Sequence, residues 1–356
     1  MSTTTELDMT ALDTFVGQLI TELGATVNAG LVFIGDQLGL YRAMAGAGPL
    51  SPTELAERTH TNERYVREWL AAQAAGGYVT YDPATETFTL PPEQAFTLAD
   101  DASPAAFAGA FQLVLSALRD APQVGERFRT GDGLGWHEHD HGLFEGTERF
   151  FRPGYAANLI SAWIPALNGV EAKLRAGARV ADVGCGHGAS TLLMAEAFPA
   201  SRFVGIDYHA ASIDTARQRA ATAGVTDRVS FVVAPAATFP GDGFDLVTMF
   251  DCLHDMGDPV AAAAHVHSTL APDGTWMIVE PRAGDRLEEN LNPVSRLFYC
   301  ASTLICTPAS LAQDGRAAFG AQAGEARIQD AVLAGGFTEF RRAAETPVNF
   351  VFEARS

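Results

Sequence analysis

The stretch Arg179-Val-Ala-Asp-Val-Gly-Cys-Gly-His-Gly-Ala-Ser190 decides the fold of this chain. It opens as an apolar, β-branched run and resumes as a predicted helix over 189–198. Between the two lie three glycines in alternate positions: Gly184, Gly186 and Gly188. Glycine permits positive φ and removes the Cβ that would block close approach, and a helix N-terminus offers unpaired N–H groups. The stretch therefore predicts backbone amides that close on a polar ligand, although such a turn alone would also serve a dinucleotide.

Beyond this stretch, strands and helices alternate along the chain. The predicted strands cover 179–185, 203–207, 229–234, 244–251 and 275–280, and the predicted helices cover 188–198, 211–223 and 259–270. This alternation predicts a parallel sheet with helices on both faces. Two last strands, 337–342 and 348–353, are joined by a link too short for a crossover, so they must be antiparallel. The predicted fold class is α/β, with a seven-stranded Rossmann-like sheet that ends in an antiparallel hairpin.

The N-terminal part has the pattern of a winged helix-turn-helix. Ser51-Pro-Thr-Glu54 forms a capping box at the start of one helix. A second helix begins after Asn62 and ends at Gly76-Gly77. The segments 78–81 and 87–90 then form a hairpin, and two helices followed by a hairpin predict a winged-helix domain.

These patterns divide the chain into three parts. They are a helical winged-helix domain for dimerisation or substrate capping (1–128), a linker and helix (129–164), and a sheet domain (165–356). Residues 10–45 are predicted to form two helices with apolar positions at helical spacing. Such a pair packs either on a partner chain, which would give a homodimer, or within its own domain.

The net charge of −19 restricts the partners. Residues 1–100 carry four arginines and thirteen acidic residues. A DNA-binding domain normally presents a basic surface to the phosphates, so we do not expect nucleic acid to be a partner. There is no unbroken run of about 20 apolar residues, so we expect no membrane partner. The polar, acidic first eight residues do not resemble a signal peptide, and the four cysteines lack paired spacing. We therefore expect a cytoplasmic protein with reduced thiols.

Acidic residues gather where the predicted strands end. Asp207 ends the second strand, Asp251 ends the fourth and Glu280 ends the fifth. In a doubly wound sheet, ligands bind outside these carboxyl ends, and a carboxylate about twenty residues after the glycines can accept both hydroxyls of a ribose. Three acids together disfavour a pyrophosphate. A ligand with a ribose, an amino group and a sulfonium cation fits this edge better.

The same segments resemble the motifs of a known family. Val180 to Gly188, Phe203-Val-Gly-Ile-Asp207 and Phe244 to Asp251 resemble successive motifs of class I S-adenosylmethionine-dependent methyltransferases, a resemblance that covers about residues 165–356. The whole chain resembles a mycobacterial and actinobacterial subgroup with an N-terminal winged helix, some members of which are labelled transcriptional regulators. The segments that carry this second resemblance are Glu63 to Leu70, Asn292 to Tyr299 and Ser310 to Gln313.

The resemblance implies a binding site for S-adenosylmethionine. Asp182 would support the glycine loop and the amino group of the methionine moiety, Asp207 would hold the ribose, and Tyr208 would flank the adenine. The other positions expected at the cofactor are Gly184, Cys185, Gly186, Gly188, Ala236, Asp251 and Cys252. The family often has an acid after the third strand for the adenine amino group, but 233–238 contains none. Backbone groups would have to take that role.

Leu253-His254-Asp255 resembles the His-Asp step of caffeate-type plant O-methyltransferases, in which the histidine is the general base. Those enzymes also begin with a dimerisation domain of winged-helix type, and their acid that orients the histidine matches Glu280. The resemblance therefore implies His254, Asp255 and Glu280 as catalytic residues. Methyl transfer mainly needs alignment and removal of a proton, for which an imidazole with a pKa of about 6.5 is suited.

Alternatives for the histidines stay open. If His254 is not the general base, one alternative is that it caps the helix that starts near Pro259. Another is that the His-Asp pair binds a metal, as in some related C-methyltransferases. The sequence shows no obvious third ligand, so we expect no metal there. The alternating His137, His139 and His141 would point the same way along an extended loop and offer a second candidate metal site. The simpler interpretation is a polar interdomain loop that covers a pocket.

Residues 284–323 exceed what the core fold needs, and they leave the carboxyl end of the fifth strand, so we expect them to cover the pocket. Their apolar residues favour a small hydrophobic or aromatic acceptor, unless they only form helix core. The predicted substrate contacts are Tyr155, Phe298 and Tyr299. The sequence thus predicts a methyltransferase for a small molecule, with O-methylation favoured. The alternatives are an S-adenosylmethionine-responsive transcriptional regulator and a methyltransferase for protein or lipid.

Overall fold

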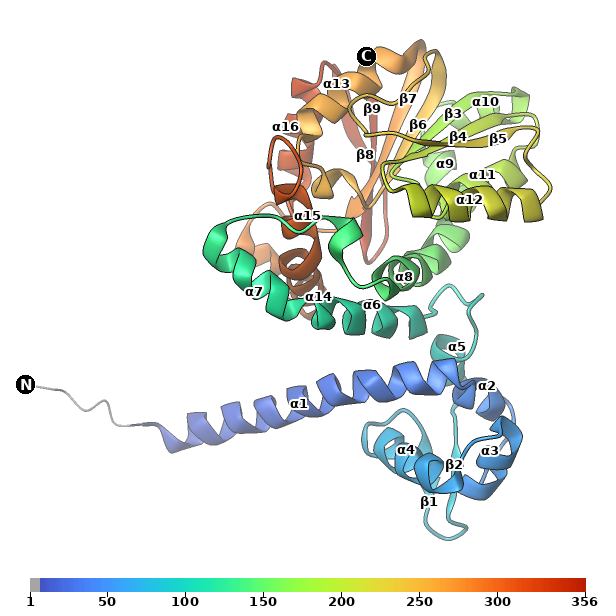
Figure 1. The fold of residues 1–356 in the computed structure, drawn as a ribbon, viewed down its shortest axis with the longest axis vertical. Helices are drawn as coiled ribbons and strands as arrows, with labels where there is room; N and C mark the ends of the chain where they lie inside the picture. Colours follow the sequence, from blue (N-terminus) through green and yellow to red (C-terminus); the bar gives the residue numbers. More distant parts are fainter. Residues whose placement is uncertain (1–6) are drawn as a thin grey trace, which may run out of the picture. The chain divides into compact units, whose positions relative to one another are not determined.

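The computed structural model describes residues 7–356, which form two compact units (Figure 1). The first unit extends to Leu115 and the second runs from Ser116 to Ser356. Residues 116–128, which we grouped with the first domain from the sequence, therefore lie in the second unit. Most of the N-terminal segment that we compared with signal peptides lies outside the described residues.

The first unit contains the predicted winged helix. Its elements are α1 (Met9–Gln37), α2 (Leu40–Met44), α3 (Pro52–Thr59), α4 (Glu63–Ala75), β1 (Thr80–Asp82), β2 (Thr87–Thr89) and α5 (Pro92–Leu98). The capping box that begins α3 is present, because Glu54 N donates to Ser51 Oγ and Ser51 N donates to the Glu54 carboxylate. Helix α4 begins after Asn62 as predicted, and the Asn62 side chain caps it. Trp69 and Leu70 of α4 centre a core that α2, α3 and the hairpin close.

Helix α1 differs from the prediction. One continuous helix of 29 residues replaces the first of two helices and most of the second. Only its C-terminal part is buried, where a Cβ on Gly35 would lie 2.6 Å from the Trp69 ring. Among the described residues, α1 is the one helix long and apolar enough to cross a membrane by length and composition. The sequence analysis missed this because polar residues and glycines interrupt its apolar run.

The second unit is a sheet with helices on both faces. Helix α6 (Ala108–Arg119) contains the boundary between the units. Further elements are α7 (Ala121–Thr130), η1 (Trp136–Glu138), α8 (Gly142–Asn158), η2 (Leu159–Trp163), α9 (Ile164–Ala166), α10 (Val170–Ala176), β3 (Arg179–Val183), α11 (Ala189–Ala197), β4 (Arg202–Asp207), α12 (Ala210–Thr222), β5 (Val229–Val233), β6 (Phe244–Phe250), η3 (Leu253–Asp255), α13 (Pro259–Thr269), β7 (Leu270–Pro281), η4 (Leu287–Asn290), α14 (Pro293–Ala301), η5 (Ser302–Cys306), α15 (Thr307–Leu311), α16 (Glu325–Ala334), β8 (Glu339–Glu345) and β9 (Asn349–Arg355).

The strand order is β5-β4-β3-β6-β7-β9-β8. The first five strands are parallel, and β9 is antiparallel to both β7 and β8, so the predicted terminal hairpin is confirmed. One hydrophobic cluster packs α8, η2, α10, α11 and α12 on one face, and another packs α13 and α16 on the other (Figure 1). The carboxyl ends of β3, β4, β6 and β7 therefore share one edge of the sheet.

Candidate active site

The three glycines after β3 all have positive φ, as the alternation predicted. A Cβ on Gly184 would lie 2.6 Å from Cys252 Sγ, and a Cβ on Gly188 would lie 2.8 Å from the Phe231 ring. These two glycines therefore permit close packing inside the protein. A Cβ on Gly186 would meet nothing within 4 Å, so this glycine faces open space.

Asp182 lies beneath the glycine loop and is buried. Its carboxylate accepts hydrogen bonds from the hydroxyls of Ser190 (2.7 Å), Thr191 (2.5 Å) and Thr248 (2.9 Å). Burial raises the pKa of Asp182, although these hydroxyls act to lower it. Asp182 thus ties β3 to the first turn of α11 and to β6. Its contact with a methionine amino group stays a prediction.

Asp207 at the end of β4 is joined directly to the glycine loop. Its Oδ2 accepts from Gly186 N at 2.9 Å and its Oδ1 accepts from His209 N at 2.8 Å. Burial raises the pKa of Asp207, and these backbone bonds oppose that change. Each oxygen keeps a further lone pair for a hydroxyl donor. Beside it, Tyr208 is 43% exposed, and Ala236 in the loop after β5 is half-buried.

Helix α8 is fixed to the glycine loop by an ion-pair network. Glu148 of α8 contacts His187 Nδ1 of the loop at 2.9 Å, and Arg219 of α12 donates to the other oxygen of the same carboxylate. Burial acts to raise the pKa of Glu148, but the hydrogen bonds from His187 and Arg219 outweigh it and lower that pKa to about 2. Phe144 stacks on His209, with ring centroids 4.3 Å apart. The sequence analysis did not identify this network.

Glu280 at the end of β7 holds η3 in two ways. Its Oε1 accepts from Leu253 N at 2.9 Å, and its Oε2 lies 2.5 Å from His254 Nδ1. Burial acts to lower the pKa of His254, but Glu280 and then Asp255 outweigh it, so the pKa lies well above its usual value. The structure thus brings the three predicted catalytic residues together, one strand from the glycine loop.

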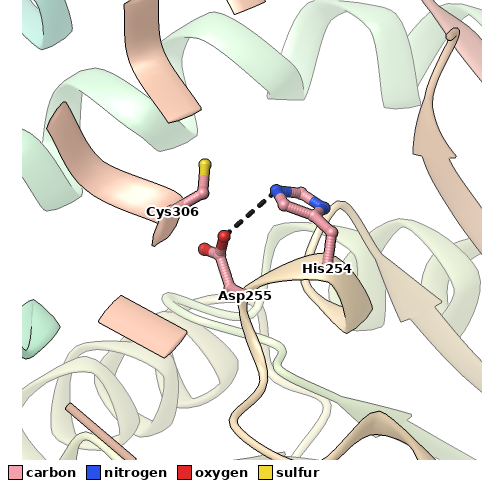
Figure 2. Close-up of side chains that lie close together, drawn as sticks. All are labelled: His254, Asp255 and Cys306. Atoms are coloured by element: carbon pink, nitrogen blue, oxygen red, sulfur yellow. Dashed lines mark ion pairs between the residues drawn. The ribbon is translucent and has the colours of Figure 1, made fainter. Parts of the chain in front are cut away.

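The second ring nitrogen of His254 faces two further side chains. Its Nε2 lies 3.1 Å from Asp255 Oδ1, and the thiol of Cys306, at the end of η5, completes the group. Figure 2 shows the three side chains converging on one space. Trp136 Nε1 donates to the other oxygen of Asp255 at 3.2 Å. Our expectation that no third ligand lies beside the His-Asp pair is therefore wrong, because the fold brings Cys306 to it.

Asp251, which directly follows β6, is hydrogen-bonded to Tyr155 of α8. Asp251 has φ of +49°, and its oxygens accept from Tyr155 Oη at 2.7 Å and Asn349 Nδ2 at 2.8 Å. Burial and then the charge of Glu280 raise the pKa of Asp251 to about 7. Tyr155, which we predicted to contact the substrate, is 8% exposed and packs in the core instead. It therefore supports Asp251 from within the protein.

The two cysteines predicted at the cofactor also pack inward. Cys252 Sγ donates to Val183 O at 3.4 Å and fills the space beside Gly184. Cys185 is buried, with its Sγ 2.9 Å from where a Cβ on Gly205 would lie. Burial raises the pKa of both thiols well above the usual value. Both cysteines thus help to shape the floor of the loop.

The C-terminal part of residues 284–323 contacts η3 and Met256, whereas the role of the whole segment as a cover stays a prediction. Ser310 Oγ donates to Met256 O at 2.7 Å, Gln313 Nε2 donates to Asp255 O at 2.8 Å, and Gly320 N donates to His254 O at 3.3 Å. The two predicted substrate contacts in this cover are Phe298, which is buried, and Tyr299, which is half-buried.

The histidines of the 137–141 segment do not point the same way. The segment begins with the 3₁₀ turn η1 and is not extended, so the alternation expected of a strand is lost. His139 is buried and its Nδ1 lies 2.8 Å from Asp120 Oδ2, whereas His137 and His141 are exposed. The three side chains therefore do not form the candidate metal site.

Comparison with known proteins finds two family models that match parts of the chain. Residues 174–319 match the family described as "Methyltransferase domain". The chain carries a methyltransferase domain. Residues 26–100 match the "Rv2258c-like winged HTH domain", so the predicted N-terminal winged helix is also confirmed. The chain is 36% identical over 108 residues to trans-aconitate 2-methyltransferase of Paracidovorax citrulli, a match that spans 30% of this chain and 40% of that protein.

Two solved structures share the fold over nearly the whole chain. The mitomycin 7-O-methyltransferase MmcR has a TM-score of 0.71 and 19% identity, with 98% of this chain and 100% of that chain covered. Human N-acetylserotonin methyltransferase, solved with S-adenosylmethionine, has a TM-score of 0.68 and 16% identity, with 100% and 99% covered. At these identities the likeness establishes the fold alone.

Four side chains at the site were not predicted from the sequence. They are Trp136, Glu148, Cys306 and Asn349. Each lies outside the strand-end motifs and reaches the site through tertiary packing. The alternation of strands and helices carries no signal for such contacts.

Proposed function

We propose that this protein transfers a methyl group from S-adenosylmethionine to a small acceptor, with an oxygen atom favoured as the methylated atom. One observation carries the proposal: Glu280 holds His254 at the strand end directly beside the strand that leads into the open glycine loop. Methyl donor and proton acceptor would therefore meet at one edge of the sheet. The match of residues 174–319 to a methyltransferase domain supports the same assignment.

The donor would lie across the glycine loop and the end of β4. Gly186 leaves room for it, since no atom lies where a side chain would be. Asp207 fixes the amide of Gly186 and keeps acceptor capacity for ribose hydroxyls. Asp182, bound by three hydroxyls, keeps the loop in place without entering the donor site.

The chemical step would need little beyond alignment and removal of a proton. His254 would take the acceptor proton on Nε2, because Glu280 already occupies Nδ1. Without a bound donor, the two carboxylates favour the imidazolium form of His254, because they raise its pKa. The positive sulfonium of a bound donor would favour the neutral base.

The acceptor would be apolar or aromatic and small. Three residues of the cover donate hydrogen bonds to the backbone of residues 254–256, so the apolar segment that contains them lies beside the proposed base. Mitomycin 7-O-methyltransferase and N-acetylserotonin methyltransferase, which share the fold, are named for small acceptors, and this supports the same class here.

Donor binding and turnover can be tested separately. Binding of S-adenosylhomocysteine is measured by calorimetry, and methyl transfer from labelled donor is measured on a panel of phenols. We expect Asp207→Ala to weaken binding at least about tenfold, because it loses the ribose acceptor. We expect His254→Ala to keep binding and to lose about 10²–10⁴-fold in turnover. Full turnover in His254→Ala would remove the base assignment, and no donor binding by the unmodified protein would remove the proposal.

The winged helix favours a second candidate, a DNA-binding regulator that responds to S-adenosylmethionine. The charges of α4 oppose it. Arg64 pairs with Glu68 and Arg67 pairs with Glu63, so each of its arginines already faces an acid. A gel-shift with the upstream DNA at physiological salt distinguishes the two, since sequence-specific binding would favour the regulator. We further propose a cytoplasmic location, which four free cysteines support.

A further inference from the structure

We propose that His254, Asp255 and Cys306 form a binding site for one zinc ion. We call these three residues the thiol–imidazole–carboxylate cluster. The proposal goes beyond the methyl transfer proposed above, because it concerns binding of a cation by the protein without donor or acceptor.

The ligand atoms are already gathered. His254 Nε2, Asp255 Oδ1 and Cys306 Sγ all lie within 4.8 Å of one another, and the nitrogen and oxygen are 3.1 Å apart (Figure 2). Zinc binds nitrogen and oxygen at about 2.0–2.2 Å and sulfur at about 2.3 Å in a tetrahedron, which places neighbouring ligand atoms about 3–4 Å apart. A shift of about one ångström in the Cys306 side chain would therefore close the cluster on a cation.

The side chains of His254 and Asp255 are oriented by hydrogen bonds of the kind found in known zinc sites. A metal-bound histidine usually donates its other N–H to a carboxylate, which fixes the ring and strengthens the ligand. Glu280 does this at His254 Nδ1, at 2.5 Å. Trp136 Nε1 in turn holds Asp255 Oδ2 at 3.2 Å, which leaves Oδ1 turned to the cluster. His254 Nε2 and Asp255 Oδ1 therefore both face the space that they share with Cys306.

One atom of the cluster lacks a hydrogen-bond partner among residues 7–356. Asp255 is 8% exposed, and its Oδ1 accepts no hydrogen bond of acceptable geometry, although it lies 3.1 Å from His254 Nε2. A buried carboxylate oxygen left in this state is costly, and a cation bound to it would remove the cost. This oxygen, which faces the imidazole of His254 without a hydrogen bond, is a second observation that favours a cation at the cluster.

Charge and softness select the cation. Asp255 and Glu280 are buried around a single imidazole, so the surroundings are anionic. The thiol disfavours magnesium and calcium, which prefer oxygen ligands, and favours zinc. Three protein ligands leave a fourth position open. A cation on His254 Nε2 would occupy the lone pair that takes the acceptor proton in the proposed transfer, so the two uses exclude each other.

Cobalt substitution tests the site without any assay of activity. The full-length protein is treated with chelator and reductant and then titrated with Co²⁺, which gives a sulfur-to-cobalt charge-transfer absorption when a thiolate binds. We expect one equivalent of Co²⁺ per chain with this absorption, and its loss when Zn²⁺ is added. In Cys306→Ser the absorption should disappear, and in Glu280→Gln the affinity should fall about 10–100-fold.

The controls come from the same chain. Cys300→Ser removes an exposed thiol of α14, and His137→Ala with His141→Ala removes the surface histidines; neither change should alter the absorption. Thermal unfolding of Cys306→Ser confirms that the variant is folded. The proposal is overturned if the unmodified protein takes up no Co²⁺, or if Cys306→Ser keeps the charge-transfer absorption. Since no methyl donor is present, failure here would leave the proposed transfer intact, and the reverse also holds.

Discussion

Gly186 allows donor binding to be separated from folding. Its φ is +52°, and a Cβ there would meet no atom within 4 Å. We expect Gly186→Ala to cost about 1 kcal/mol of stability, from backbone strain alone. We also expect it to weaken S-adenosylhomocysteine binding at least about tenfold, because the new methyl group would occupy the donor's space. Urea unfolding and calorimetry measure the two effects.

Substitutions at two other glycines serve as comparisons for Gly186→Ala. Gly169 also has positive φ and open space, but it lies before α10, so Gly169→Ala should show the same strain and normal binding. Gly184→Ala would place a methyl group 2.6 Å from Cys252 Sγ and should destabilise the protein more than either. Normal donor affinity in Gly186→Ala would contradict the placement of the donor at this loop.

The Glu148 ion pairs predict a pH-dependent contribution to stability. The folded-state pKa of Glu148 is about 2, below its ordinary 4.5, so its contribution is complete above about pH 5 and is lost as the pH falls toward 2. We expect Glu148→Gln to lower the free energy of unfolding by about 2 kcal/mol at pH 7, and by about 1 kcal/mol less at about pH 3.5. Denaturant unfolding at the two pH values measures this.

A matched change tests the cause of that effect. Glu145 lies one turn away on α8, and Glu145→Gln is the control for removing one acidic charge from this helix. If the two substitutions gave the same difference at both pH values, the effect would come from net charge. The pairing of Glu148 with His187 and Arg219 would then not be its source.

At this scale, the sequence predicted residues that lie in or beside strand-end motifs. Asp207 and Glu280 were predicted at strand ends, and the resemblance to caffeate-type O-methyltransferases implied that Glu280 orients His254. Cys306 could not be found this way, because a lone cysteine in an apolar segment has no spacing signal. Tyr155 was misplaced because an aromatic residue near a site is as suited to a core as to a substrate.

Among the elements, the 131–138 segment, which we call the strap, depends on one close approach. Leu134 N donates to Pro308 O at 2.9 Å, and a Cβ on Gly133 would lie 1.9 Å from Ala312 N. We expect Gly133→Ala to displace the strap from α15 and to cost about 1–3 kcal/mol. Limited proteolysis near residues 129–141 and urea unfolding measure this.

A nearby glycine is the control for the strap. Gly125 lies inside α7 with nothing within 4 Å of a Cβ, so Gly125→Ala should be neutral or stabilising by up to about 1 kcal/mol. Equal protease sensitivity in the two variants would show that the close approach of Gly133 to α15 does not hold the strap.

The elements themselves were predictable where local chemistry determines them. The capping box of α3 and the start of α4 after Asn62 depend on local chemistry, and both were predicted. The turn η1 was missed, because histidines in alternate positions are also the pattern of an extended segment. The hydrogen bond from Glu138 N to Gly135 O forms a 3₁₀ turn instead. The length of α1 was also missed, since residues 10–45 were expected to form two helices, whereas one helix extends from Met9 to Gln37.

At the scale of the whole molecule, the directions of the strands followed from two rules, whereas their order in the sheet was not predicted. Alternating strands and helices require parallel pairing, and a short link requires an antiparallel return. The boundary between the units was placed later than the structure has it, because α6 and α7 read as a continuation of the N-terminal helices. Charge composition is the basis for the prediction that the first unit does not bind DNA, and the arginines on α4 are paired with acids, which agrees with it.

The exposed face of α1 carries the prediction of a homodimer. Leu12, Val16, Leu19 and Leu23 recur at the alternating spacing of four and three residues that coiled coils use, and Leu23 is 65% exposed. The helix is roughly 40 Å long, so a second copy of α1 would bury this stripe along much of its length. We expect Leu19→Glu with Leu23→Glu to convert a dimer into a monomer, measured by light scattering after size-exclusion chromatography.

The opposite side of the same helix provides the control. Thr14 and Thr21 are exposed and lie across the helix from the stripe, so Thr14→Glu with Thr21→Glu adds the same two charges without touching it. This variant should stay dimeric, because only the apolar face is buried in the expected dimer. A monomeric unmodified protein would contradict the prediction. Binding of that monomer to lipid vesicles, lost in Leu19→Glu with Leu23→Glu, would instead identify the stripe as a membrane-facing surface, which its length and apolarity also permit.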